Sequence, residues 1–123
     1  MKYFLTLIIT VLLSTALFAQ TKIEAKDASK HVGEKVTVCD KVFSTKLITG
    51  SNMTLLNVGG YYPNQLFTVV IKGVDRSRFK NQPEDYYKGK SISVTGTLID
   101  YKGKPEIVVS DSTELQISKP VHK

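Results

Sequence analysis

Tyrosines and lysines are the residues of this chain whose types suit ligand binding. Tyr61 and Tyr62 follow a Gly-Gly pair, and Tyr101 begins the turn Tyr-Lys-Gly-Lys. Single-stranded nucleic acid binds where aromatic faces stack on the bases and a cationic track meets the phosphates. The candidate binding residues combine these tyrosines with lysines and amides of the neighbouring loops: Lys46, Asn52, Tyr61, Tyr62, Asn64, Gln65, Lys72, Tyr101, Lys102 and Lys104.

Each of these groups also has a structural interpretation. Tyr61 and Tyr62 stand between the Gly-Gly pair and a proline, a setting in which aromatic rings pack a loop against a core. Asn64 and Gln65 are typical of turns, where their side chains bond to the backbone. The Lys-Gly-Lys turn is equally typical of a soluble hairpin. The residue types leave both interpretations open.

Residues suited to catalysis are dispersed along the chain. A metal-dependent nuclease needs carboxylates that converge on a cation and an arginine that holds the phosphate. The carboxylates form no cluster on neighbouring predicted strands, and Arg76 and Arg78 fall in a polar insertion. No serine sits in a nucleophile-elbow pattern. We therefore expect a binding protein with no catalytic activity and no cofactor.

Cys39 is the only cysteine, which excludes an intramolecular disulfide. It lies in the middle of an apolar alternation, and we interpret it as a buried thiol that packs as a small hydrophobic group. A catalytic cysteine needs a histidine partner, and neither His31 nor His122 lies in a nucleophile motif. These three residues also lack the spacing of a zinc site, so no bound metal is expected.

The first 19 residues are predicted to be a signal peptide. Lys2 supplies the positive start, and Phe4–Phe18 is an almost unbroken apolar run, long enough for a signal-peptide core and short for a membrane span. Ala19 suits cleavage, with Ser14–Ala16 as an alternative cleavage site and an uncleaved anchor as the other interpretation. The mature chain is expected to be exported to the periplasm or the extracellular medium, with no further membrane span.

Residues 20–123 are predicted to form a single domain. They carry 16 basic and 11 acidic side chains, and the excess lies in scattered lysines. A basic surface attracts nucleic acid, anionic polysaccharide or lipid headgroups. It is equally typical of a well-solvated exported protein. Charge alone therefore selects no partner.

Alternating apolar residues predict five strands separated by turn formers. The runs are rich in β-branched and aromatic residues. Gly96 offers the fourth strand a place to bend, and Asp40 interrupts the inner row of the first, which is typical of a bulge or kink. The predicted strands cover residues 35–46, 55–58, 66–71, 91–98 and 105–109, with the last two paired as a hairpin.

Shorter segments complete the predicted domain. One helical turn is expected within 23–32. The alternation stops over 72–89, between the third and fourth strands, where two helical turns are expected, the second beginning at Pro83. Phe79 and one of two nearby tyrosines would then plug an open end of the strands. A short closing segment is expected around 115–117.

Five segments carry a family resemblance: Asp27–Cys39, which includes HVGEKVTVC at its end, Leu56–Gly59 (LNVG), Tyr62–Ile71 (YPNQLFTVVI), Gly89–Gly96 and Tyr101–Ile107 (YKGKPEI). In these residues the chain resembles exported bacterial OB-fold domains, often described as nucleic-acid-binding proteins. The resemblance covers nearly the whole mature domain. Asp40 departs from it, because a glycine is expected there.

The expected fold is therefore an all-β, or mainly β, five-stranded OB-fold, a Greek-key barrel with a short helical insertion between its third and fourth strands. The element order alone also fits other small barrels. OB-folds bind oligonucleotides or oligosaccharides on the face of the second and third strands, between loops that correspond here to 44–52 and 101–104. We expect an exported module that binds single-stranded nucleic acid or another oligomeric polyanion on this face. The alternative is a protein-interaction or envelope stress module, with an envelope protein as its partner and no nucleic-acid role.

Overall fold

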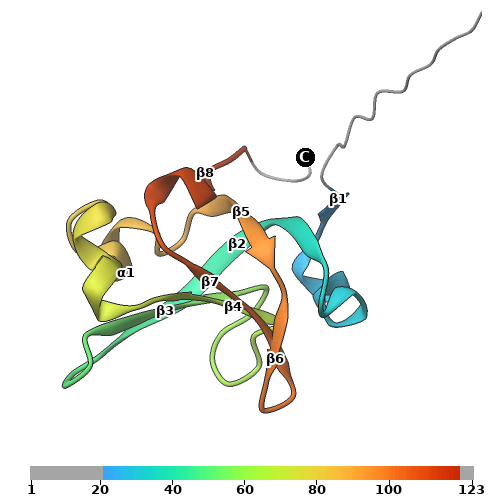
Figure 1. Ribbon diagram of the computed structural model, residues 1–123, viewed down its shortest axis with the longest axis horizontal. Coiled ribbons are helices and arrows are strands. Elements are labelled where there is room, and N and C mark those ends of the chain that lie inside the picture. The colour runs from blue at the N-terminus through green and yellow to red at the C-terminus, as the bar shows by residue number, and fades with distance from the viewer. Residues whose placement is uncertain (1–20, 120–123) are drawn as a thin grey trace, which may run out of the picture.

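The computed structural model describes residues 21–119, and this part of the chain is mainly β (Figure 1). The predicted signal peptide at 1–19 and His122 lie outside the described residues. Between residues 21 and 119, no helix is long and apolar enough to cross a membrane.

Eight strands and four short helical segments make up the described chain. The helical segments are η1 (Ala25–His31), η2 (Gly73–Arg78), α1 (Pro83–Tyr86) and η3 (Ser112–Glu114). The strands are β1 (Thr21–Ile23), β2 (Lys35–Ile48), β3 (Met53–Val58), β4 (Phe67–Ile71), β5 (Ser91–Thr97), β6 (Ile99–Tyr101), β7 (Lys104–Val109) and β8 (Leu115–Ile117).

The strands form one curled sheet in the order β6-β7-β4-β3-β2-β5-β8, with β1 parallel to β2. The first half of β2 pairs with β5 and the second half with β3, and the register shifts between Val42 and Ser44. A bulge of this kind bends a strand and strengthens its twist. β4 and β7 are parallel, whereas the other pairs along this path are antiparallel.

The sheet does not close into a barrel, although β5 and β7 approach each other. A side chain at Gly96 would place its Cβ 2.6 Å from Cγ2 of Ile107, so only glycine allows the two strands to pack at this distance. Among the described strands, β5 forms ladders with β2 and β8, and β7 forms ladders with β4 and β6. β5 and β7 therefore pack together without a ladder, with the Ile107 side chain against the backbone of Gly96.

The five predicted strands are present as β2, β3, β4, β5 and β7, but two expectations about them are wrong. Between residues 21 and 119 there are eight strands, not five, and the hairpin partner of β7 is β6, not β5. Leu98 explains the difference, because its side chain is fully buried and its backbone bonds to Gly33 and Glu34. The chain is thereby held against the start of β2 before β6 begins.

Asp40 does not mark the bend predicted in the first strand. It pairs regularly with Ile92, and the bulge follows two residues later. One carboxylate oxygen of Asp40 accepts a hydrogen bond from the backbone N–H of Ala25 at 3.0 Å, and the other accepts from that of Lys41. Asp40 therefore ties η1 to β2.

The hydrophobic core lies inside the curled sheet and is covered at one end by η2 and α1 (Figure 1). Phe79 and Tyr87 are buried in it, as the plugging role predicted, while Tyr86 packs against it from a half-buried position. Arg76 binds Glu84 at 2.7 Å and also donates to the hydroxyl of Thr54 on β3. These bonds fix the helical insertion to the sheet.

Candidate functional site

The outer face of the sheet carries a row of polar side chains. Ladder pairing places Ser44 on β2, Asn57 on β3, Thr68 on β4 and Glu106 on β7 directly opposite one another. Paired residues point to the same face of a sheet, and their neighbours along each strand point to the core. Asn57 and Thr68 are nevertheless each only 3% exposed. Another segment must therefore cover this row.

That segment is the loop joining β3 to β4, residues 59–66, called here the 59–66 loop. Figure 1 shows it below the sheet, between the β2–β3 and β6–β7 hairpins. The Tyr62 backbone N–H donates to Oγ of Ser44, and the Gln65 side-chain amide donates to Oγ1 of Thr68, both at 3.2 Å. From the other side, Nζ of Lys104 donates to the carbonyl oxygens of Pro63 at 3.0 Å and Gln65 at 2.8 Å. The loop is thus anchored on β2, β4 and β7.

A hollow of about 520 Å³ lies between this loop and the β2–β3 ribbon. Tyr61 and Tyr62 stand at its rim and are 64% and 69% exposed. The ring of Tyr61 packs edge-on against Phe43, with ring centres 5.2 Å apart. The residues that line the hollow are Ser44, Thr45, Lys46, Ile48, Leu55, Asn57, Tyr61 and Tyr62.

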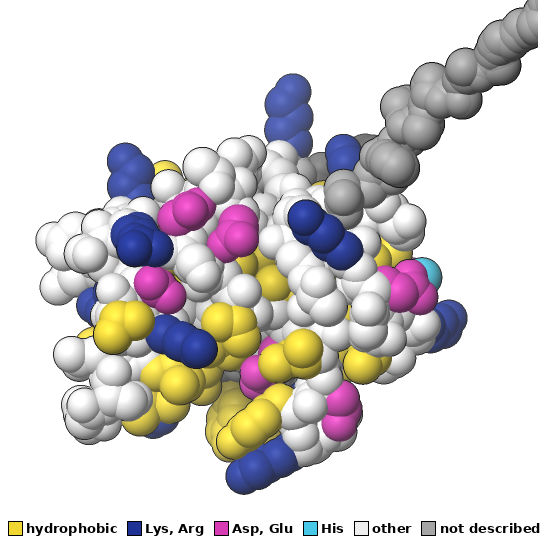
Figure 2. All heavy atoms as spheres, in the orientation of Figure 1, with side chains coloured by type: hydrophobic (Ala, Val, Ile, Leu, Met, Phe, Trp, Pro, Cys, Tyr) yellow, Lys and Arg dark blue, Asp and Glu magenta, His cyan; other side chains and the backbone are white. Residues whose placement is uncertain are grey.

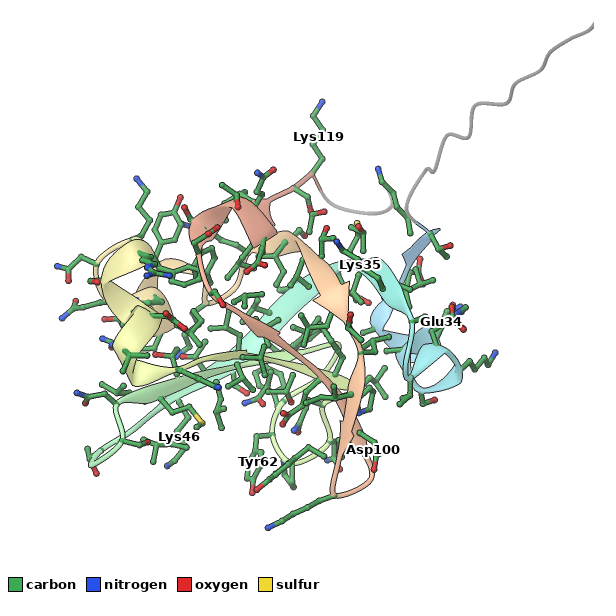
Figure 3. The ribbon with its side chains drawn as sticks, in the orientation of Figure 1. Glu34, Lys35, Lys46, Tyr62, Asp100 and Lys119 are labelled. Atoms are coloured by element: carbon green, nitrogen blue, oxygen red, sulfur yellow. The ribbon has the colours of Figure 1, made fainter. Side chains whose placement is uncertain are left out.

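Three of the sequence-predicted binding residues, Lys46, Tyr61 and Tyr62, therefore meet at one hollow. Figure 3 shows the labelled Lys46 and Tyr62 along the same lower side of the molecule. On that side Figure 2 shows hydrophobic side chains gathered together, with lysine or arginine side chains beside them. Aromatic and aliphatic groups can stack on a planar ring, and a cationic group beside them attracts a negatively charged substituent of the same ligand.

Tyr101 and Lys102 lie at the β6–β7 hairpin, on the far side of the 59–66 loop from β2. Tyr101 is exposed, and Nζ of Lys102 lies 5.2 Å from the centre of its ring. Lys104, by contrast, uses its ammonium group to hold the loop carbonyls. Its role in this structure is therefore to position the loop.

Asn52 and Lys72 lie apart from the hollow. Asn52 takes a left-handed backbone (φ 61°) in the turn between β2 and β3, and Lys72 precedes η2. Gly73 packs closely against this turn, because a Cβ there would clash with the carbonyl oxygen of Ser51. The two residues thus lie near each other at the end of the β2–β3 ribbon that is farther from Tyr61 and Tyr62, and neither lines the hollow.

The two loop amides differ in their surroundings. Asn64 is exposed, and its backbone N–H donates to the Tyr61 carbonyl at 2.7 Å, which closes a turn. Gln65 is buried with 7% of its surface exposed. Gln65 therefore belongs to the packing under the loop, whereas Asn64 faces solvent.

Sequence reasoning missed Asn57, which lies at the hollow, and Glu106, which ends the polar row. The signal for Asn57 was present, because a polar residue in the apolar run Leu-Leu-Asn-Val requires a partner or a function. Burial raises the pKa of Glu106 above its ordinary value. The sequence-based list of candidate residues thus omitted the polar residues of the sheet itself.

Cys39 is half-buried, which corrects the expectation of a fully buried thiol. Its Sγ lies 3.6 Å from Oγ of Ser93, and both residues line a second hollow formed by β1, η1, β2 and β5. Within residues 21–119 there is no group of three or more His, Cys, Asp or Glu side chains that could hold a metal ion.

Comparison with known proteins gives a likeness at the level of fold. No family model and no curated protein matches the chain. Among solved structures, the chain is similar to one described as an aspartyl-tRNA synthetase from Leishmania major Friedlin, with a TM-score of 0.54 and 12% identity. The match covers 94% of this chain and 24% of that one. The chain thus spans about a quarter of that protein, and at this identity the likeness concerns the fold alone.

Proposed function

We propose that this protein is an OB-fold binding module that takes single-stranded nucleic acid, or another oligomeric polyanion, on the outer face of β3 and β4. The observation that carries the proposal is the hollow at which Tyr61, Tyr62 and Lys46 meet. Aromatic rings supply stacking faces for bases, and lysines supply charge for phosphates.

The strand arrangement supports the OB-fold part of the proposal. β2, β3, β4, β5 and β7 follow one another with a helical insertion between β4 and β5, and β7 runs parallel to β4. The OB-fold is a five-stranded Greek-key barrel that is often only partly closed. β1, β6 and β8 are then short additions of three residues each.

In the proposed complex, one base enters the hollow against the exposed Tyr62 ring and the side chain of Leu55. The phosphate backbone follows the surface from Lys46 toward Lys102. Tyr61 is less free to move, because its ring is braced by Phe43. Tyr62 is therefore the main stacking residue of this proposal.

The test is fluorescence anisotropy of labelled single-stranded DNA and RNA, with polyphosphate as a polyanion without bases, over a series of salt concentrations. We expect the nucleic acids to bind more tightly than polyphosphate. Tyr62→Ala should weaken nucleic-acid binding by roughly 5- to 150-fold, the equivalent of about 1 to 3 kcal/mol per stacked base. Tyr62→Phe, which keeps the ring, should bind as the wild type does. If polyphosphate binds as tightly as the oligonucleotides, the binding is due to the basic surface alone and the stacking site is contradicted.

The lysine contribution has its own matched comparison. Lys46→Ala should lower the slope of log affinity against log salt by about 0.7, the value for one phosphate contact with a single strand. Lys88→Ala removes the same charge from an exposed position beyond α1 and should leave the slope unchanged. Equal slopes for both variants would mean that Lys46 makes no specific phosphate contact.

We further propose that residues 1–19 direct export and that the mature protein binds without catalysis. Mass spectrometry of the protein from periplasmic and medium fractions should find a chain that begins at Gln20. Incubation of oligonucleotides with the mature protein and Mg²⁺ should leave them intact. Cleavage by pure protein would contradict the non-catalytic proposal.

A protein partner is the second candidate, favoured by large hydrophobic side chains exposed near the same face. Leu66 belongs to the 59–66 loop, while Ile99, Tyr101 and Val108 come from β6 and β7, and all four are exposed. Exposed apolar groups that cluster are typical of protein interaction sites. This candidate would be favoured if the mature protein captures one envelope protein at all salt concentrations and does not bind nucleic acid. Val108→Asp should then abolish the capture.

A further inference from the structure

The hollow contains one polar group that the proposed stacking contacts do not use, the side chain of Asn57. This residue lies on β3 opposite Ser44 and Thr68 and lines the hollow, although it is almost fully buried. Its Nδ2 donates to Oγ of Ser44 at 3.2 Å. The same Oγ accepts the backbone N–H of Tyr62. The first bond fixes the direction in which the Asn57 amide points, and the second ties the 59–66 loop to the same hydroxyl.

The other end of this amide is free to accept. Oδ1 of Asn57 is buried, and no residue from 21 to 119 donates to it. A buried carbonyl without a donor is unfavourable, because it has lost its bonds to water and gained none. Next to a hollow that its own residue lines, such an oxygen has the properties of a recognition group that a ligand completes.

A second acceptor lies close by on the same covered face. The Gln65 Nε2 donates to Oγ1 of Thr68, the residue that pairs with Asn57 across the β3–β4 ladder. Its Oε1 likewise accepts from no donor in the described part of the chain. Both amides therefore direct their nitrogens to hydroxyl groups of the protein and keep their oxygens unused. The space beneath the 59–66 loop is consequently rich in acceptors.

The ligand that fits such a space must donate hydrogen bonds and be neutral and planar. Lys46 at the hollow repels a cationic donor such as an ammonium group. The aliphatic wall of Ile48 and Leu55 and the Tyr62 ring suit a flat ring. Cytosine, adenine and guanine carry an exocyclic amino group, whereas uracil and thymine present carbonyl oxygens on either side of a single N–H. A carbonyl oxygen of uracil or thymine placed against these protein acceptors would be repelled, because neither atom carries a hydrogen to donate.

We propose that the hollow selects nucleobases with an exocyclic amino group, which donates a hydrogen bond to Oδ1 of Asn57. This inference rests on the proposed binding of single-stranded nucleic acid. Because the Asn57 oxygen is closed off from water, a base reaches it only as the 59–66 loop lifts. Gln65 supplies the second acceptor when the loop moves with the base.

The test compares oligo(dC) with oligo(dU) of equal length at pH 7.5 and one salt concentration. These bases differ only in the amino group against the carbonyl and in the protonation of the adjacent ring nitrogen. We expect oligo(dC) to bind at least about fivefold more tightly, the lower limit for one specific base contact. Asn57→Leu should bring the two affinities together by weakening oligo(dC), while Asn81→Leu, at an exposed position outside the hollow, should preserve the preference.

The outcomes separate this inference from the proposal on which it rests. Tight but equal binding of both oligonucleotides by the wild type would overturn the selection and leave the binding face intact. A preference that survives in Asn57→Leu would overturn the role of Asn57. Absence of binding to either oligonucleotide would overturn both. Should Asn57→Leu fail to fold, as judged by circular dichroism, the wild-type comparison with oligo(dA) and oligo(dT) added still decides whether amino-bearing bases are preferred.

Discussion

Lys104 should act as a clamp whose removal loosens the 59–66 loop and leaves the core folded. Its ammonium group bonds the carbonyls of Pro63 and Gln65 from β7, and the loop has further anchors only on β2, β3 and β4 among the described residues. Lys104→Met keeps most of the aliphatic stem and removes both hydrogen bonds. The change therefore tests the clamp with little loss of packing.

The expected magnitude follows from these two bonds. A hydrogen bond to a charged group contributes about 1.5 to 3 kcal/mol when buried. Lys104 is half-buried, and its bond to Pro63 is exposed, so solvent screening reduces the sum to about 1 to 3 kcal/mol. Expressed as local opening, this is a roughly 5- to 150-fold rise in the open population of the loop.

Hydrogen exchange followed by NMR is the direct assay. The amides of Tyr62, Asn64 and Leu66 bond to Ser44, Tyr61 and Val58, and they report the loop. Their exchange should accelerate in Lys104→Met, while the ladder amides of β3 and β4 keep their protection. Lys102→Met is the control, because its Nζ contacts only the Tyr101 ring within the described chain. Unchanged loop exchange in Lys104→Met, or an equal effect in Lys102→Met, would refute the clamp.

Three further predictions concern stability. Gly96→Ala should lower the free energy of unfolding by about 1 to 3 kcal/mol, seen as a lower urea midpoint, because its Cβ would lie 2.6 Å from Ile107; an unchanged midpoint would mean that β5 and β7 separate freely. Arg76→Met should destabilise the protein at neutral pH and less in acid. Burial raises the pKa of Glu84, but its hydrogen bonds to Arg76 and the backbone outweigh this effect and leave the pKa below 4.5. The ion pair therefore stabilises the fold fully above pH 4.5, and this stabilisation is lost as the pH falls through the lowered pKa of folded Glu84. A destabilisation independent of pH would contradict the ion pair. Glu106→Gln should gain stability relative to the wild type as the pH rises from 4 to 7, because burial raises the Glu106 pKa and ionisation in the folded state becomes unfavourable above it; parallel urea midpoints across this range would contradict that effect.

The sequence predicted β5 well because its burial is one-sided, and β3 and β4 because short apolar runs between turn formers are of strand length. The alternation in 91–98 and the apolar runs before and after the 59–66 loop correspond to β5, β3 and β4. The partner of β7 was mispredicted, because a short turn at 101–104 fits a hairpin with either β5 or β6. That choice depends on the burial of Leu98 and its bonds to Gly33 and Glu34, which are far away in sequence. β1, β6 and β8 are too short to produce a periodic signal.

The candidate site was predicted less completely, since it depends on how a loop folds back over a sheet. Tyr61, Tyr62 and Lys46 meet as expected, but Lys72 and Asn52 lie at the other end of the ribbon. The sequence identifies Lys104 as a cation, but it does not indicate that the ammonium group donates hydrogen bonds to two carbonyls of the 59–66 loop. For Asn57, the sequence shows a polar residue within an apolar strand, but only the structure shows that its side-chain oxygen accepts no hydrogen bond within the described residues.

The bulged strand β2 also determines how the chain can fold. It contributes to the ladder with β3 through near neighbours, such as Ile48 with Met53, and to the ladder with β5 through distant ones, such as Lys35 with Thr97. Pairs that are far apart in sequence require closure of a long loop and slow the folding of small β proteins. The β2–β3 hairpin can therefore form early, whereas the first half of β2 must wait for β5 to be in place. Because both halves share one continuous strand, we expect them to unfold in a single transition.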